Sequence, residues 1–532
     1  MIYINEDHRK RLPIVRIKKI HLENFKNVKK GEILCECGRT FIEQGTESDI
    51  IGLYGQNGSG KTTIIQALQL LQYLLVGYPM TAEFSDFISA DADTAFLSYT
   101  FDLQYEDGRQ REVVYTFKIA QSKNQNSSRL FSNNGRFFDI MESLVNRGTV
   151  LRIYDECIQM SGVFYDKSIK RQTVIDTSLS DSVFVFGPAS KRKYFITEEN
   201  KNILYANKLS SEKNCTSFIF ESDTLKEFAK INSEYFEVIA ELVYFAQRNL
   251  YIITTNNYGA ISSSKLLPLH TKRPTLTAIN ASLLMEGIMS EEIESEIYKD
   301  ESYNSLMNDE DFQRGIVDVL PSINPIYFPL SSTIEILKSE YSYIESEINS
   351  ISLVLSSLIP GNEIFLRKNS ESTNARGQEI IFADLMIRKN GKELPLRYES
   401  DGTIKLIGML NCLIMAYNKK SVTVAIDEID SGVFEYLLGE ILQIFEEGGR
   451  GQLFFTSHNL RPLEVLNKKY LFFTTTDENN RYVHLKNIGK TNNLRNVYYR
   501  EILEMEGDDV SFYSGTQKYK IATAFRKAGV NE

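Results

Sequence analysis

The sequence has few cysteines and histidines, and it lacks any long apolar run. Its 532 residues include five histidines and five cysteines, at positions 35, 37, 157, 215 and 412. An odd, scattered set of cysteines predicts reduced thiols and not a disulfide framework. No stretch approaches the ~18 consecutive apolar residues of a membrane span, and the charged N-terminus has no apolar secretory core. We therefore expect a cytoplasmic protein that does not associate with membranes.

The sequence also lacks an excess of basic residues. Its 60 Lys and Arg residues stand against 70 Asp and Glu, so the formal net charge is −10, which excludes a protein that is polycationic all over. A composition of 42% hydrophobic and 24% charged residues excludes wholesale disorder. At about 150 residues per domain, the length corresponds to three or four domain-sized units.

The first part of the chain predicts strands and one helix. Residues 14–34 alternate apolar and polar positions, the period of a half-buried sheet. The apolar run 50–54 is a further strand, and apolar residues recur every three or four positions in a helix expected from 62 to about 75. Residues 95–103 and 112–119 are expected to pair as an antiparallel hairpin.

The middle of the chain, 121–384, is expected to be a mixed, mainly helical insertion. Its clearest pattern is an apolar heptad seam over Ile334–Leu358, and Ser332 and Glu335 fit a capping box at its start. We interpret the seam as one amphipathic helix lying on the body of the protein. A short helical hairpin or a dimer contact is the alternative.

Beyond residue 380, apolar strands alternate with helices. Strands are expected at 380–387, 421–426 and 452–456, and helices at 403–416 and 434–445. Continuous apolar strands separated by helices predict a parallel sheet that is covered on both faces.

A phosphate-binding motif follows the strand at 50–54. Residues 55–62, Gly-Gln-Asn-Gly-Ser-Gly-Lys-Thr, match G-x-x-x-x-G-K-[ST] between a strand and a helix. The glycines let the backbone curl so that its amides point at the β-phosphate. Lys61 is placed to neutralise the β- and γ-phosphates, and Thr62 offers a hydroxyl to Mg²⁺. We therefore predict ATP and Mg²⁺ as ligands, with the nucleotide held by Gly55, Gln56, Asn57, Gly58, Ser59, Gly60, Lys61, Thr62 and Thr63.

Two acids and a histidine follow the later strands. Asp427 and Glu428 come directly after an apolar run, at the sheet edge where ligands collect in such folds. Asp427 is expected to hold the magnesium together with Thr62, and Glu428 to orient or deprotonate the attacking water. His458 ends the next strand, where it faces the same ligand and is expected to hydrogen-bond the γ-phosphate.

Five segments together carry a family resemblance. Residues 17–27 and 52–63 resemble the start of RecF- and SMC-type ATPase heads. Residues 397–407, in the form Glu-Ser-Asp-Gly-Thr, are similar to the signature region, in a variant common in ABC-type AAA proteins of prokaryotic defence systems. Residues 426–432 and 456–459 resemble the Walker-B/D-loop and His-switch segments. Among subfamilies, the chain is most similar to the ATPase subunits of Septu-like, retron-associated and PARIS-like anti-phage systems.

The resemblance implies a fold and a division of the chain. The fold class is α/β, a P-loop ABC-type ATPase head with a mixed sheet and flanking helices, interrupted by the insertion. Residues 1–120 are expected to form the N-terminal lobe, 121–384 the insertion, and 385–532 the C-terminal lobe with its extension.

The resemblance also implies a dimer. In such heads the signature serine and glycine bind the γ-phosphate held by the opposite subunit, and the matching residues are Ser400 and Gly402. The expected assembly is a head-to-head homodimer, or a higher even oligomer, with ATP sandwiched between the subunits. Many relatives have glycine at the position of Asp401. Whether this loop contacts the γ-phosphate of the opposite subunit as theirs does is therefore an open question.

Two functions remain open. The first is an ATP-driven sensor and regulator of a partner effector, an HNH-type or other nuclease or toxin, in anti-phage defence. The alternative is a RecF- or SMC-like DNA-binding ATPase of DNA repair or recombination. Basic clusters at 8–11, 191–193 and 270–273 are interpreted as solvated surface, with phosphate contact as the alternative, so nucleic acid stays open as a ligand.

Overall fold

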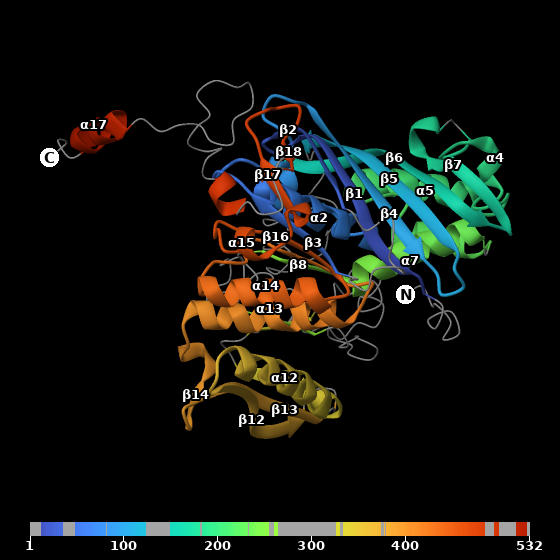
Figure 1. Cartoon of the computed structure of the whole chain (residues 1–532). Coiled ribbons are helices and arrows are strands. Elements are labelled where there is room, and N and C mark those ends of the chain that lie inside the picture. Colours follow the sequence, from blue (N-terminus) through green and yellow to red (C-terminus); the bar gives the residue numbers. More distant parts are fainter. Residues whose placement is uncertain are drawn as a thin grey trace.

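The described part of the protein contains two six-stranded sheets, a four-stranded third sheet and one two-stranded pair (Figure 1). The computed structural model describes residues 12–35, 48–80, 82–123, 149–180, 183–231, 233–254, 260–263, 326–329, 333–373, 377, 379–484, 494–498 and 518–528. Helices lie between and around the sheets, so the expected α/β class is confirmed.

The central sheet has a parallel core and carries the phosphate-binding motif. Its strands pair in the order β18-β17-β3-β16-β15-β8, and only the pair of β17 and β18 among them is antiparallel. The parallel sheet predicted from the strands at 421–426 and 452–456 is thus confirmed. The strand expected at 380–387 was assigned wrongly to it, because it is β13 (Glu379–Lys389) of another sheet, where all its neighbours are antiparallel. A tight turn joins β13 to the next strand, and such short connections link antiparallel strands. The bounds are β3 (Asp49–Tyr54), β8 (Leu250–Ile253), β15 (Thr423–Ile426), β16 (Gln452–Thr456), β17 (Leu471–Thr474) and β18 (Tyr482–Val483).

Both faces of the central sheet are buried because neighbouring residues of each strand enter different cores. On β3, Ile51 and Leu53 join the core around helix α2 (Lys61–Val76). Ile50 and Tyr54 join the core around helices α13 (Asp401–Asn418) and α14 (Glu435–Gly448). Strands buried on both sides need continuous apolar runs, which is the pattern that the sequence shows.

An antiparallel sheet packs over α2 from the other side. Its strands pair in the order β2-β1-β4-β5-β6-β7, which confirms the strands expected at 14–34 and the hairpin. The hydroxyl of Tyr99 on this sheet donates to the Ala67 carbonyl of α2 at 2.7 Å. The bounds are β1 (Ile14–Phe25), β2 (Val28–Leu34), β4 (Thr94–Gln104), β5 (Gln110–Lys123), β6 (Thr149–Phe164) and β7 (Lys167–Asp176).

The third sheet corrects the start of the predicted seam helix. Residues Ile334–Leu337 form strand β11, which pairs with β13, and helix α12 runs over Lys338–Leu358 with Leu337 as its N-cap. The first apolar residues of the seam are isoleucines at alternate positions, and these β-branched side chains suit a strand. The helix start at 334 and the capping box were therefore wrong. The rest of the seam is confirmed, since Ile344, Ile348, Ile351 and Leu355 are buried.

The remaining elements complete the description. The third sheet also contains β12 (Asn362–Thr373), β13 (Glu379–Lys389) and β14 (Lys392–Pro395), and β9 (Ala260–Ser263) pairs with β10 (Ile326–Pro329). No helix in the described ranges is long and apolar enough to cross a bilayer. The other helices are α4 (Ala189–Arg192), α5 (Lys201–Asn214), α6 (Ser222–Ala229), α7 (Glu234–Arg248), α15 (Pro462–Val465) and α17 (Lys518–Ala528), with short 3₁₀ turns η1 (Ala82–Phe87), η3 (Thr177–Leu179), η4 (Leu396–Tyr398) and η5 (Lys468–Tyr470).

The middle of the chain contributes to both large sheets. Strands β6 and β7 extend the antiparallel sheet, and β8 is the edge strand of the central sheet. The described residues of 121–384 therefore contain strands as well as helices. The division into 1–120, 121–384 and 385–532 stays a prediction.

Candidate nucleotide-binding site

The loop between β3 and α2 has the backbone that a phosphate cradle needs. Gly55, Gly58 and Gly60 have φ values of 151°, 75° and 105°, a region that residues with a side chain rarely adopt. A Cβ at Gly55 would lie 1.7 Å from the Thr474 hydroxyl oxygen of β17. The first glycine of the motif is therefore required by space as well as by conformation.

Lys61 begins α2 and is held inside the loop. Its Nζ donates to the carbonyl oxygens of Gly55 and Gln56 at 2.8 and 3.0 Å, and the residue is only 6% exposed. Burial lowers the pKa of Lys61, while the carboxylates of Asp427, Asp430 and Glu428 act in the opposite direction. A desolvated ammonium at the N-terminus of a helix is suited to binding phosphate.

Thr62 and Asp427 meet across the sheet edge as predicted. The Thr62 hydroxyl donates to Asp427 Oδ1 at 3.1 Å, and the Thr456 hydroxyl at the end of β16 donates to the same oxygen at 2.6 Å. Hydroxyl and carboxylate oxygens are the ligands that Mg²⁺ prefers, and in nucleotide sites it takes only one or two of them from the protein. No group of three or more acidic, Cys or His side chains suited to a metal occurs in the described ranges.

Glu428 has an unusual backbone that its neighbours fix. Its φ is 49°, in the left-handed region. Its amide donates to the Thr456 hydroxyl at 2.7 Å, and its carbonyl accepts from the Lys405 Nζ of α13. These two contacts fix the backbone of Glu428 and so restrict the direction in which its partly exposed side chain points.

His458 lies on the exposed side of the same edge. Its backbone amide donates to Asp430 Oδ2 at 3.1 Å, and the amide of Asn459 donates to the same oxygen at 2.9 Å. Asp430 therefore ties the segment after β15 to the segment after β16. The structure brings together the predicted residues of the phosphate-binding loop, Asp427, Glu428 and the His458 segment.

Ser400 and Gly402 lie with the Asp430–Gly432 segment. The Ser400 hydroxyl accepts from the Thr403 amide at 3.3 Å and so caps α13. A Cβ at Gly402 would lie 2.0 Å from the Gly432 carbonyl oxygen, so the two glycines bring the backbones of the two segments into contact. Ser400 and Asp401 are exposed and are accessible to a second molecule.

Sequence reasoning missed three polar residues of this site. Thr456 and Lys405 fix Asp427 and Glu428, and burial lowers the pKa of Lys405 to about 8. Lys26, in the turn after β1, lies close enough to Asp427 for the carboxylate to affect its pKa, which burial lowers. The position of Thr456 at the end of a strand next to Asp427 was a usable signal. Lys405 and Lys26 come from elements whose position depends on the tertiary fold.

A glycine-rich loop with a buried lysine, a threonine and a facing aspartate defines this protein as a P-loop nucleotide-binding protein of the α/β class. A family model described as "AAA domain, putative AbiEii toxin, Type IV TA system" matches residues 50–150 and 165–464. Because this match spans more than half of the chain, the protein belongs to that AAA-domain family. No curated protein matches the chain.

Solved structures of similar proteins include ATPase heads. The SMC head of Pyrococcus furiosus, bound to the C-terminal domain of ScpA, has a TM-score of 0.35 and 14% identity over 88% of this chain and 96% of its own. The recombination mediator RecF with ATP has a TM-score of 0.33 and 12% identity, and the match covers 89% of this chain and 100% of RecF. The SMC head of Thermotoga maritima has a TM-score of 0.32 and 12% identity, also over 89% and 100%. These likenesses are distant.

Proposed function

We propose that this protein binds and hydrolyses ATP, dimerises head-to-head, and controls a partner effector, an HNH-type or other nuclease or toxin, in anti-phage defence. The observation that carries the ATPase proposal is the arrangement around Thr456, which places Asp427 beside Thr62 and fixes the backbone of Glu428. The defence role is supported by the sequence resemblance and by the family description, which names a toxin and a Type IV TA system.

The geometry supports a separate chemical role for each residue of the site. Lys61 and the loop amides bind the β- and γ-phosphates, and Thr62 and Asp427 hold Mg²⁺, which would neutralise phosphate charge. Glu428 accepts the proton of, or orients, the attacking water. His458 donates a hydrogen bond to the γ-phosphate from the exposed side.

A second copy of the chain is proposed to complete the site with Ser400 and Gly402. Large aromatic side chains next to this segment and to the Gly432 segment are exposed: Tyr398 is 69% exposed and Phe434 is 74% exposed. The backbone contact between Gly402 and Gly432 keeps the two segments together. Exposed aromatic residues that cluster around polar groups are typical of an interaction surface.

Ser400→Arg is expected to leave ATP binding by the monomer intact and to abolish dimer formation and turnover. An arginine on this exposed residue would add bulk and charge where the partner's phosphate is proposed to lie. Light scattering with and without ATP, together with phosphate release, tests this result. Ser357→Arg, on the exposed face of α12, is the matched control. Unchanged turnover in Ser400→Arg would count against the composite site.

Thr456→Val is expected to reduce ATP turnover about tenfold or more and to lower the free energy of unfolding by about 1–3 kcal/mol. Valine keeps the shape of threonine but leaves the Glu428 amide without its acceptor and Asp427 without one donor. Thr456→Ser keeps the hydroxyl and should behave like the wild type. Steady-state hydrolysis and urea unfolding test both variants, and a fully active Thr456→Val would refute the positioning role.

A DNA-binding ATPase of repair or recombination is the second candidate. The basic segment 191–193, which is exposed or partly exposed, favours a nucleic-acid ligand, whereas the clusters at 8–11 and 270–273 lie outside the described residues. The neighbouring genes discriminate the two proposals. An adjacent gene for an HNH nuclease, reverse transcriptase or toxin supports the defence role, and a replication or repair operon supports the second candidate.

A further inference from the structure

An aromatic cluster lies where the β6–β7 turn meets the segment after α4. The rings of Tyr165 and Tyr194 are stacked, with centroids 5.5 Å apart and an interplanar angle of 27°. Tyr235 of α7 meets Tyr194 edge-on at 5.0 Å. Tyr165 is 40% exposed, so part of a large aromatic ring is open to solvent at the tip of a hairpin.

The backbone at this tip is uncommon for an aromatic residue. Tyr165 and Asp166 have φ values of 49° and 58°, the left-handed pair of a two-residue hairpin turn that asparagine and glycine usually occupy. A bulky residue in this conformation is rare. The backbone conformation at residue 165 therefore does not favour a tyrosine.

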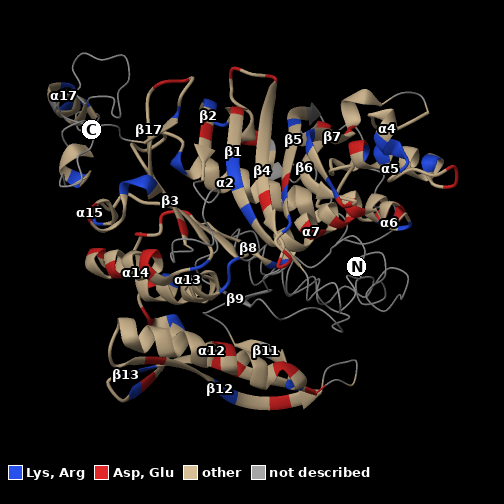
Figure 2. Cartoon of the chain, turned by 45° about the vertical axis from the view of Figure 1, so that its right-hand side comes forward, with Lys and Arg blue, Asp and Glu red and all other residues tan. Residues whose placement is uncertain are grey.

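Two lysines surround the same rings. The Lys191 Nζ donates to the Tyr235 hydroxyl at 2.8 Å and lies 4.5 Å from the centroid of that ring. The Lys193 Nζ lies 5.0 Å from the centroid of Tyr194. Figure 2 shows these basic residues gathered at α4. Ammonium groups over aromatic faces are attracted by the ring electrons, and here they form a compact positive surface.

The two lysines carry like charges that lie close enough to affect each other. Neither Lys191 nor Lys193 forms an ion pair with any residue in the described ranges. Burial lowers the pKa of Lys191, and the charge of Lys193 acts in the same direction. Two like charges held together without a carboxylate are unfavourable unless an anion binds there.

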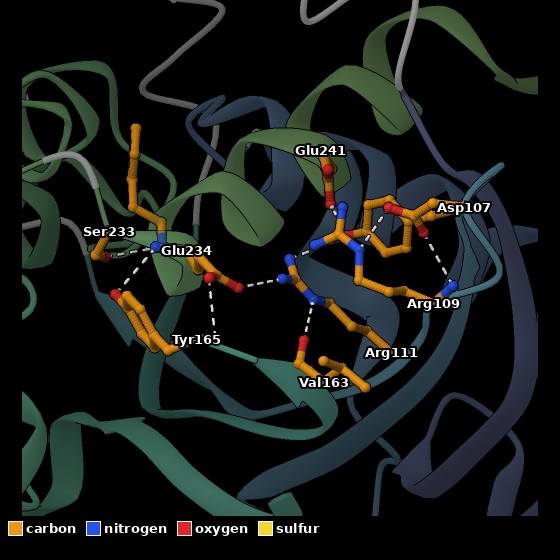
Figure 3. Close-up of polar contacts among 10 residues, drawn as sticks. Asp107, Arg109, Arg111, Val163, Tyr165, Ser233, Glu234 and Glu241 are labelled. Carbon is orange, nitrogen blue, oxygen red and sulfur yellow. Dashed lines mark hydrogen bonds and ion pairs between the residues drawn. The ribbon is translucent and has the colours of Figure 1, made fainter. Parts of the chain in front are cut away.

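The carboxylate that contacts Tyr165 is already engaged. Glu234, the first residue of α7, forms an ion pair with Arg111, and its other oxygen accepts from the Tyr165 amide at 2.9 Å (Figure 3). The Tyr165 hydroxyl in turn accepts from the Glu234 amide at 3.1 Å. Figure 3 shows Glu234 turned toward Arg111, so this carboxylate holds the hairpin on α7 and does not neutralise the lysines.

We propose that Tyr165, Tyr194, Lys191 and Lys193, here named the hairpin patch, form a binding site for single-stranded DNA. A base stacks on the exposed ring of Tyr165, and phosphates meet the two ammonium groups, the combination by which proteins hold single strands. Unstacked bases are needed, so a duplex does not fit. The hydroxyls of Tyr165 and Tyr235 each accept a hydrogen bond within the protein.

Fluorescence anisotropy with a labelled oligothymidylate and the full-length protein tests the proposal. We expect binding at low ionic strength that weakens with salt. Lys191→Gln/Lys193→Gln should weaken it about tenfold or more and reduce the salt slope by about 0.7 for each lost phosphate contact. Tyr165→Ala should weaken binding about fivefold or more, and Tyr165→Phe, which keeps the ring, should stay near the wild type.

The matched control is Lys392→Gln/Lys419→Gln, which removes the same charge from two exposed positions on β14 and after α13. This control should bind within about twofold of the wild type, because only local phosphate contacts carry the affinity. Lys193→Glu alters only an exposed side chain and serves as a second variant if the double variant unfolds. Absence of binding by the wild type, equal weakening in both double variants, or tighter binding of oligouridylate or of a duplex would each overturn the proposal.

Discussion

Glu428→Gln is expected to bind ATP normally, to lose about 100- to 10,000-fold in turnover, and to accumulate as an ATP-bound dimer. Glutamine preserves the volume of the side chain and the backbone contacts of this residue to Thr456 and Lys405. It removes the carboxylate that is proposed to act on the attacking water. Binding and dimerisation, which depend on other residues, should therefore remain.

Single-turnover hydrolysis and the solution mass in the presence of ATP measure this result. Glu440→Gln, at an exposed position of α14, makes the same chemical change and should not alter either quantity. Normal hydrolysis by Glu428→Gln would show that another group acts on the water. Loss of nucleotide binding would instead show that Glu428 has a structural role.

Lys61→Ala is expected to weaken ATP binding about ten- to a hundredfold or more, because one charged hydrogen-bond donor to phosphate is worth about 1.5–3 kcal/mol. The buried Nζ lies among loop carbonyls at the start of α2. Titration with a fluorescent ATP analogue measures the affinity. Lys392→Ala, on exposed β14, is the control and should bind like the wild type.

The stability of Lys61→Ala provides a separate check. Burial lowers the pKa of Lys61 in the folded chain below its unfolded value, so the charged form is destabilised by folding at neutral pH. Removing the side chain relieves this cost but also removes two hydrogen bonds to loop carbonyls, so the two effects on the unfolding midpoint without nucleotide oppose each other. ATP should raise the midpoint of the wild type but not of the variant, and an equal rise in both would contradict the role of Lys61.

The positions of the glycine-rich loop and of the acids that face it could be predicted from the sequence. These residues belong to short continuous motifs, and their placement follows from the parallel order of β3, β16 and β15. Once the carboxyl ends of the strands share one edge, Asp427 must lie near Thr62. The local chemistry of the motif and the topology of the sheet agree, and the Thr62 hydroxyl does reach Asp427; the roles of these residues stay a prediction.

Contacts between distant segments could not be predicted in the same way. The Lys405 contact to Glu428 depends on how α13 packs on the sheet, and the approach of Gly402 to Gly432 depends on the path of two loops. The start of α12 was misplaced because Ile334 fits a heptad together with Leu337 and fits a strand together with Ile336. Pairing of β11 with β13 decides in favour of the strand, and that partner is far away in the sequence.

The central claim is that each ATP site uses Lys61 of one chain and Ser400 of another. Mixing Lys61→Ala with Ser400→Arg, each inactive alone, tests it most directly. In a two-fold dimer each mixed pair contains one intact site, so an equal mixture should recover up to roughly a quarter of wild-type turnover. Turnover no higher than the mean of the two variants measured separately would contradict the composite site.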